Sequence, residues 1–196
     1  TPMVENLLKG SVDVTVYNRS FDKTLPLVEK GAKNTKNVEE IFEQNDTIFF
    51  MISNYSAALE ILNENVLSKI KGKKIVNMST ISPTESKAVG KLVIENNGKY
   101  IEAPVSGSVG AATAGVLLIL VGGNEADTKD LYSIFDILGS KTYYFGELGK
   151  ATGAKLVLNS LLGIFGEAYS EVLLLAQNFG IDTETIVNAI SDSRMS

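Results

Sequence analysis

Strand-like and helix-like segments alternate along most of this 196-residue chain, and this alternation restricts its fold more than any other feature. Short β-branched or apolar runs are each followed by a stretch whose apolar residues have helical spacing. The predicted strands cover residues 12–18, 46–53, 73–79, 99–105, 115–123 and 141–146. Repeated strand–helix–strand units favour a mainly parallel sheet with helices on both faces, so we predict a doubly wound α/β domain.

The pattern changes after Gly146, beyond which no further strand is predicted. Residues 151–180 form one long helical pattern, and another helix begins after Asp182. We therefore predict two parts, an α/β domain over residues 1–147 and the start of an all-helical region over residues 148–196.

The beginning of the chain differs from that of a usual doubly wound domain, which starts with a strand and a glycine-rich turn leading into the first helix. Here the first ten residues, TPMVENLLKG, have the pattern of such a helix ending at Gly10. We expect the first strand and its loop to be missing ahead of Thr1, and the helical region to be incomplete after Ser196.

Composition excludes several classes of site. The chain has no cysteine and no histidine, which rules out disulfides, zinc sites with Cys or His ligands, and a histidine base. No Asp/Glu spacing argues for another metal, so we expect none. A net charge of −5 without a basic tail disfavours nucleic acid and anionic membranes as partners. No uninterrupted apolar run is long enough to span a bilayer, and the start lacks the shape of a signal peptide. We expect a cytoplasmic protein, a location that the absence of cysteine fits.

Three polar residues, Asn18, Arg19 and Ser20, lie at the end of the strand predicted over residues 12–18. In dinucleotide-binding sheets an acidic residue at this place binds the ribose hydroxyl of NAD, whereas an arginine suits the extra phosphate of NADP. A guanidinium forms bidentate charge-assisted hydrogen bonds to phosphate, and a hydroxyl adds another. The alternative is a solvated turn, because Asn-Arg-Ser is a common loop composition.

Two further strands end in residues that are placed to contact a ligand, because ligands bind beyond the carboxyl ends of the strands in an open α/β sheet. Met51, Ile52 and Ser53 end one strand, and Thr80 follows another. The alternative is that Met51 and Ile52 are core residues and that Thr80 begins the cap of the next helix.

The segment EAPVSGSVGAATAG, residues 102–115, is the end of a strand followed by residues that are nearly all small. Its glycines and serines allow close backbone approach and offer N–H and hydroxyl donors to an anion. It lacks the Gly-Lys-Ser/Thr of a Walker loop. The alternative is a flexible turn before the strand predicted over residues 115–123.

A lysine and an asparagine interrupt the otherwise small and apolar stretch GKATGAKLVLNS. Lys155 and Asn159 are four residues apart and therefore share one face of a helix, which continues through Gly163 and Gly166 to Ser170. The two glycines each weaken a helix by roughly 1 kcal/mol relative to alanine. Such a stripe suggests that another helix or a ligand packs against it, and the alternative is a helix–helix contact from which the lysine reaches solvent.

Four stretches together resemble the β-hydroxyacid dehydrogenases, a 6-phosphogluconate dehydrogenase-like family that includes 3-hydroxyisobutyrate dehydrogenase, tartronate semialdehyde reductase and glyoxylate/succinic semialdehyde reductase. They are, in the family's order, TPMVENLLKG (1–10), VYNRS (16–20), NMSTISP (77–83) with EAPVSGS (102–108), and GELGKATGAKLVLN (146–159). The resemblance covers essentially the whole chain. It implies a Rossmann-like doubly wound dinucleotide-binding domain followed by a helical domain for substrate binding and dimerisation.

The resemblance also implies roles for individual residues. Lys155 is implied to be the catalytic lysine, with Asn159 beside it in the substrate site, and the substrate carboxylate is implied to bind at Ser106, Gly107 and Ser108. The family usually has glycine in place of Ser108, so its hydroxyl either narrows the pocket or adds a donor. The implied cofactor-binding residues are Asn18, Arg19, Ser20, Met51, Ile52, Ser53 and Thr80.

These roles imply hydride transfer between a nicotinamide and a small carboxylate-bearing semialdehyde, 2-oxo acid or hydroxy acid, with Lys155 as general acid and base. Arg19 favours NADP over NAD, and reduction over oxidation. The alternatives are 3-hydroxyisobutyrate oxidation with NAD and a non-catalytic dehydrogenase-like domain used for binding or oligomerisation. Imine reductases rank lower because they commonly replace the lysine. The apolar faces of residues 151–180 suggest a homodimer or homotetramer.

Overall fold

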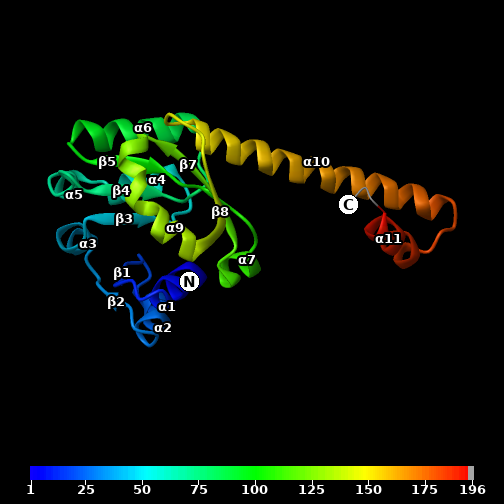
Figure 1. Ribbon diagram of the computed structural model, residues 1–196, viewed down its shortest axis with the longest axis horizontal. Helices are drawn as coiled ribbons and strands as arrows, with labels where there is room; N and C mark the ends of the chain where they lie inside the picture. The colour runs from blue at the N-terminus through cyan, green and yellow to red at the C-terminus, as the bar shows by residue number, and fades with distance from the viewer. Residues whose placement is uncertain (194–196) are drawn as a thin grey trace. The chain divides into compact units, whose positions relative to one another are not determined.

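The computed structural model describes residues 1–193 and divides into two compact units, Thr1–Leu156 and the residues from Val157 onward. The first unit is an α/β domain, and the second contains only helices among its described residues (Figure 1). The predicted fold class, a doubly wound α/β domain followed by a helical region, is confirmed.

The first unit contains two sheets, and the larger one lies at its centre (Figure 1). In the smaller sheet, β1 (Thr15–Val16) is parallel to β2 (Lys33–Asn34). The larger sheet has the order β3-β4-β5-β7-β6, with β8 paired to β7. Its strands are β3 (Thr47–Phe50), β4 (Lys74–Asn77), β5 (Lys99–Glu102), β6 (Val105–Ser106), β7 (Leu117–Gly123) and β8 (Gly139–Tyr144).

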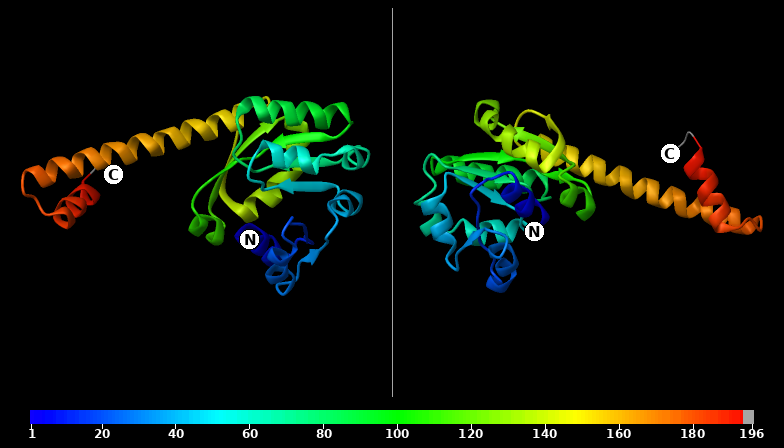
Figure 2. Two further views of the ribbon diagram at one scale, coloured as in Figure 1. Left: turned by 180° about the vertical axis from the view of Figure 1, so that it is seen from behind. Right: turned by 60° about the horizontal axis from the view of Figure 1, so that its bottom comes forward.

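Helices cover both faces of the larger sheet (Figures 1 and 2). Consecutive residues of one strand point to opposite faces. Ile75 of β4 therefore lies in one apolar cluster and Val76 in another, and Tyr100 and Ile101 of β5 are divided in the same way. The helices of the first unit are α1 (Pro2–Lys9), η1 (Phe21–Thr24), α2 (Leu25–Val28), α3 (Val38–Gln44), α4 (Tyr55–Ile61), α5 (Glu64–Leu67), α6 (Pro83–Glu95), α7 (Val109–Ala114), α8 (Glu125–Thr128), η2 (Lys129–Leu131) and α9 (Tyr132–Leu138), and α10 (Lys150–Asn178) begins in it.

Most strand pairs are parallel, as predicted, and the exceptions are the pairs that β7 forms with β5 and β6. Strands β3, β4 and β5 are parallel, but β7 is antiparallel to β5 and β6 and parallel to β8. Only the short helix α7 connects β6 to β7, and a connection of that length suits antiparallel neighbours, whereas a parallel pair needs a longer crossover. Pro104, which has no N–H to donate, separates β5 from β6, so the strand predicted over residues 99–105 is divided in two.

Residues 56–70 have the sequence pattern of one helix, but this part of the chain forms two, α4 and α5. The side chain of Asn63 accepts a hydrogen bond from the Val66 N–H at 3.1 Å, so it caps a new helix. Asparagine is much better suited to a helix N-cap than to a helix interior, which explains the division.

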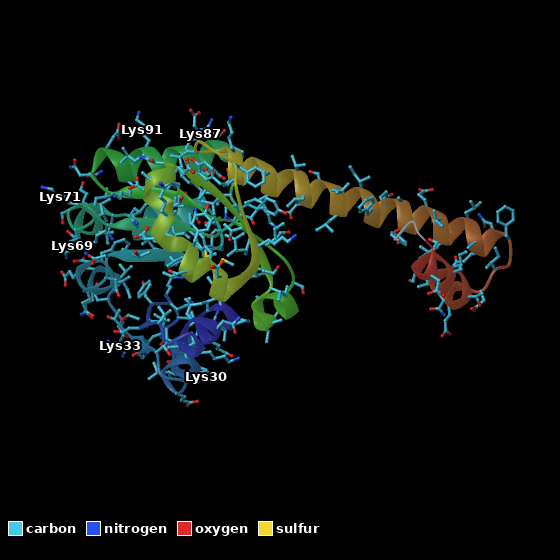
Figure 3. The ribbon with its side chains drawn as sticks, viewed as in Figure 1. Lys30, Lys33, Lys69, Lys71, Lys87 and Lys91 are labelled. Atoms are coloured by element: carbon cyan, nitrogen blue, oxygen red, sulfur yellow. The ribbon has the colours of Figure 1, made fainter. Side chains whose placement is uncertain are left out.

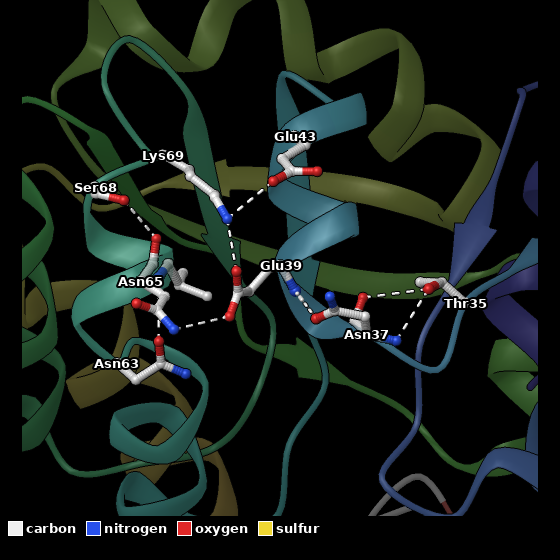
Figure 4. Close-up of polar contacts among 9 residues, drawn as sticks. Thr35, Asn37, Glu39, Glu43, Asn63, Asn65, Ser68 and Lys69 are labelled. Carbon is white, nitrogen blue, oxygen red and sulfur yellow. Dashed lines mark hydrogen bonds and ion pairs between the residues drawn. The ribbon is translucent and has the colours of Figure 1, made fainter.

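An ion-pair network joins α5 to α3 (Figure 4). Lys69 follows α5, and its Nζ lies 2.6 Å from the Glu39 carboxylate and 2.9 Å from that of Glu43. Asn65 also donates to Glu39, at 3.0 Å. Hydrogen bonding to these carboxylates raises the pKa of Lys69, and hydrogen bonding to Lys69 lowers the pKa of Glu39.

A cavity of about 450 Å³ lies between β1 and β3 and separates the two sheets. Each of these strands is paired on one side only, with β2 and β4 respectively. Alternate residues of β3 bond to β4, and the backbone groups of Thr47 and Phe49 are therefore directed into the gap. Apolar side chains from both layers of helices, such as Leu7 and Phe42, line the cavity. Within residues 1–193, no strand occupies it.

The second unit consists of the rest of α10 and of α11 (Thr183–Asp192), and many of its apolar side chains are exposed. Within the second unit, a Cβ added to Gly163 or Gly166 would meet no described atom within 4 Å. The packing partner predicted for this stripe therefore stays a prediction. By length and composition, α10 is apolar enough to cross a membrane. The search for uninterrupted apolar runs missed this helix, because its glycines, serines and few charged residues interrupt every run.

Candidate functional site

The residues predicted to distinguish NADP from NAD form an exposed turn directly after β1. The Ser20 N–H donates to Asn18 Oδ1 at 2.9 Å, which fixes the turn. The Arg19 side chain is 88% exposed, and one of its guanidinium nitrogens lies 3.9 Å from the Glu60 carboxylate. An exposed ion pair at this distance contributes little free energy. The guanidinium and the Ser20 hydroxyl therefore have the chemistry and the freedom that binding a phosphate requires.

The loops that follow β3 and β4 are held together by a hydrogen bond. The Ile52 N–H donates to Ser79 Oγ at 2.8 Å, and Ile52 packs against the apolar cluster that contains Phe50. Met51 is 61% exposed, so the interpretation of Met51 as a core residue is wrong. Ser53 and Thr80 are exposed on the same two loops. The structure thus brings these candidate residues together at the carboxyl edge of the sheet.

A buried polar network lies beneath these loops, and sequence reasoning missed it. The Ser79 N–H donates to Asn77 Oδ1 at 3.0 Å, and Asn77 Nδ2 donates to the Tyr100 hydroxyl at 2.9 Å. The Ser86 hydroxyl lies 3.1 Å from the same oxygen. Burial raises the pKa of Tyr100 to about 12, so the phenol is neutral at physiological pH. The network fixes Ser79, and Ser79 in turn fixes Ile52.

The small-residue segment predicted to bind a carboxylate follows β5. Gly107 has φ +142°, and a Cβ there would lie 2.9 Å from the side chains of Ala111 and Leu117, so only glycine fits. Ser108 caps α7 by accepting a hydrogen bond from the Ala111 N–H at 3.4 Å, which leaves its own hydroxyl hydrogen available to an anion. Ser106 is half-buried in β6. Because residues 109–114 form α7, the alternative of a flexible turn is wrong for them.

Lys155 differs from the surface lysines of the first unit. It is only 8% exposed, and this burial lowers the pKa of its ammonium group. Within residues 1–193, no carboxylate forms an ion pair with it and no hydrogen bond links it to Ser106, Gly107 or Ser108. In contrast, five lysines labelled in Figure 3 are exposed: Lys30, Lys33, Lys71, Lys87 and Lys91.

Asn159 lies one helical turn after Lys155 on α10, is exposed, and belongs to the second compact unit. Its place in a substrate site stays a prediction. Among the described residues, no three Asp or Glu side chains are grouped so as to hold a metal ion.

An exposed arginine after a strand, loops at the carboxyl edge of the parallel strands β3 and β4, and a buried lysine are the arrangement expected of a dinucleotide-binding domain. Residues 1–146 match the family model described as the NAD binding domain of 6-phosphogluconate dehydrogenase. The chain belongs to this family, and the resemblance inferred from its motifs is confirmed.

Individual relatives differ in the functions that their names state. The chain is 33% identical over 194 residues to glyoxylate/succinic semialdehyde reductase 2, chloroplastic, of Arabidopsis thaliana, a match that covers 97% of the chain and 54% of the relative. It is 32% identical over 190 residues to cytokine-like nuclear factor N-PAC of Drosophila melanogaster, covering 95% of the chain and 32% of the relative. The chain therefore spans about half of the first protein and about a third of the second.

A solved structure confirms the fold. That of Mycobacterium tuberculosis 3-hydroxyisobutyrate dehydrogenase with L-serine matches the chain with a TM-score of 0.90 at 22% identity, over 100% of this chain and 67% of that one.

Proposed function

We propose that the whole protein transfers a hydride between a nicotinamide dinucleotide, preferably NADP, and a small carboxylate-bearing semialdehyde or 2-oxo acid. The observation that carries the proposal is a buried lysine of lowered pKa, Lys155, on a domain of an NAD-binding family. The Arabidopsis relative, named for glyoxylate and succinic semialdehyde, supports this class of substrate.

The chain's residues fit a cofactor that carries an additional phosphate, because Arg19 and Ser20 offer a guanidinium and a hydroxyl at an exposed strand end. When bound, the cofactor supplies or accepts the hydride. The loops at Ile52 and Thr80 would position it along the sheet edge. NAD is the second choice of cofactor.

Lys155 would donate or accept the proton of the reaction. When a hydride adds to a carbonyl carbon, the carbonyl oxygen becomes negatively charged, and a nearby ammonium group stabilises and protonates that oxygen. Burial lowers the pKa of Lys155, which makes the group a better proton donor near neutral pH. In the oxidative direction, the neutral amine would accept the proton from the hydroxyl of the substrate.

The remaining site residues would orient the substrate. Ser106, Gly107 and Ser108 would hold its carboxylate, and the Ser108 hydroxyl hydrogen is available for this purpose because the oxygen accepts, rather than donates, in capping α7. Asn159 would orient the reacting oxygen or the lysine. We assign dinucleotide binding to residues 1–147 and substrate binding and dimerisation to the helical region that begins at residue 148.

The proposal includes self-association in the cytoplasm, as a homodimer or homotetramer. Its support is the exposed apolar surface of the second unit, where Ile164 is 64% exposed and Phe179 is 72% exposed. Patches of this kind mark interaction surfaces. We propose no nucleic acid partner, since the net charge is −5.

A second candidate is a non-catalytic role in binding or oligomerisation, which the relative named as a nuclear factor favours. The retained Lys155 argues for catalysis. The oxidative alternative, 3-hydroxyisobutyrate oxidation with NAD, uses the same residues in reverse.

The test is to measure NADPH and NADH consumption by the whole protein with glyoxylate, succinic semialdehyde, tartronate semialdehyde and methylmalonate semialdehyde. We expect turnover with at least one substrate, faster with NADPH. Oxidation of 3-hydroxyisobutyrate with NAD but no reduction would favour the oxidative alternative. Failure of a folded protein to bind either nucleotide would favour the non-catalytic role.

A further inference from the structure

Glu102 is a fully buried carboxylate at the end of β5 to which the mechanism above gives no role. Burying an ionised group is costly unless it is well hydrogen-bonded. Its Oε1 accepts a hydrogen bond from the Gly149 N–H at 2.6 Å, and its Oε2 accepts one from the Thr152 N–H at 3.3 Å. The Thr152 hydroxyl lies 3.4 Å from Oε1. The carboxylate therefore faces donors from one short segment, residues 149–152.

That segment is the beginning of α10, the helix that carries Lys155. The first N–H groups of a helix have no partner within it, and they carry partial positive charge that favours a carboxylate. Gly149 has φ +91° and lies against the side chain of Lys87, so the residue before α10 must be glycine and has no side chain with which to cap it. Glu102 supplies the cap from the sheet.

Other helices of the first unit are capped locally. Asn37, Asn54 and Asn63 cap α3, α4 and α5 from the residue directly before each helix. The cap of α10 instead comes from a residue 47 positions earlier in the chain. A local side chain would satisfy the same N–H groups, whereas Glu102 also fixes where the helix begins on the sheet.

The beginning of α10 lies so close to the sheet that the residue at position 122 must be small. Gly122 of β7 pairs with Glu102 in the sheet, and a Cβ there would lie 2.9 Å from Glu102 Oε2 and 3.0 Å from the Cβ of Ala151. Ala151 is fully buried. Glycine at position 122 thus allows α10 to begin directly against the carboxylate.

We propose that Glu102 is a positioning residue: by anchoring the beginning of α10, it holds Lys155 in a fixed place relative to Ser106, Gly107 and Ser108. Lys155 follows Thr152 by three residues, and Ser106 follows Glu102 by four residues. One carboxylate therefore joins the segment that carries the lysine to the strand that leads into Ser106, Gly107 and Ser108. The role rests on the proposed function of Lys155, while the anchoring of α10 does not.

The test compares Glu102→Gln with Asn63→Ala in the whole protein. Glutamine has the same shape as glutamate, but one of the two acceptor oxygens is replaced by an NH₂ group. That NH₂ group would face the N–H of Gly149 or Thr152, and two donors cannot form a hydrogen bond with each other. Asn63→Ala removes a cap from α5, which lies away from the beginning of α10 in the first unit (Figure 1), and serves as a control for lost stability. We expect kcat to fall by about a hundredfold in Glu102→Gln, since small misplacements of a catalytic group are costly. The dissociation constant of NADPH in Glu102→Gln should stay within about twofold of that of the unaltered protein, because the proposed cofactor residues Arg19 and Ile52 lie on loops that Glu102 does not contact.

Hydrogen exchange gives a readout that does not depend on activity. The amides of residues 149–152 should exchange faster in Glu102→Gln than in the unaltered protein, and should be unaffected in Asn63→Ala. If Glu102→Gln does not fold, Gly122→Ala, which pushes against Glu102 Oε2, serves as the second variant with the same expected results.

Unchanged exchange at residues 149–152 would overturn the anchoring. A kcat within about twofold of the control at equal folded fraction would overturn the positioning role even if the exchange increased. If the unaltered protein turns over none of the substrates, the proposed function fails, and the exchange data still decide whether Glu102 anchors α10.

Discussion

Replacing Lys155 with alanine is expected to reduce turnover by about 10²- to 10⁴-fold, the usual contribution of a positioned general acid. The physical reason is that the oxygen of the reduced carbonyl loses both the ammonium charge that stabilises it and its proton donor. Binding of NADPH should persist, since the cofactor contacts are proposed on other loops. The measurement is kcat with NADPH and the best substrate, together with nucleotide binding by fluorescence.

Lys150→Ala is the matched control, because Lys150 is an exposed lysine in the first turn of the same helix. It should leave kcat nearly unchanged. Equal losses in the two variants, or a Lys155→Ala variant with nearly full activity, would contradict the catalytic role.

The pH dependence of the same reaction tests the role of Lys155 independently. Lys155 donates a proton during reduction, so reductive kcat/KM should decline as pH rises through its pKa, and oxidative kcat/KM should rise instead. Because burial lowers this pKa, both changes should occur below about 10.4, the ordinary value for lysine. Lys155→Ala should lose this pH dependence, and its persistence in the variant would assign the titration to another group.

Replacing Arg19 with aspartate is expected to change the cofactor preference from NADPH to NADH. Hydrogen bonds to a charged group contribute about 1.5–3 kcal/mol, so the KM for NADPH should rise by about 10- to 100-fold. The KM for NADH should change far less, since NADH lacks the phosphate and aspartate can accept from its ribose hydroxyl. The measurement is the ratio of kcat/KM for the two nucleotides.

Lys23→Asp makes the same change of charge at an exposed position in the neighbouring helix η1 and controls for a general electrostatic effect. An equal loss with NADPH and NADH in Arg19→Asp, or an equal shift of preference in Lys23→Asp, would show that Arg19 does not bind the phosphate.

Local patterns were sufficient to predict most of the fold. Apolar runs such as residues 46–53 marked the central strands, because buried parallel strands have few polar residues. The two-residue strand β2 (Lys33–Asn34) left no such pattern. The direction of β7 was not predicted either, since direction depends on the length of its connection to β6 rather than on the composition of the strand.

Some residues of the candidate site could likewise be predicted from the sequence, and others could not. Lys155 stands out because a charged residue interrupts an apolar helix, and Arg19 because it follows a strand, but only the resemblance to a family implied their roles. Glu102 and Tyr100 were missed, although both are buried and polar. Their roles depend on partners such as Gly149 and Asn77, which are far away in the sequence, so no local spacing indicates them.

Hydride transfer itself is tested most directly with NADPH that carries deuterium at the nicotinamide C4, supplied as each of its two diastereomers in turn. Mass spectrometry of the product from the best substrate measures where the label goes. We predict one deuterium on the former carbonyl carbon from one diastereomer and none from the other. Product without deuterium from either, or no product with any substrate from a protein that binds NADPH, would contradict the account.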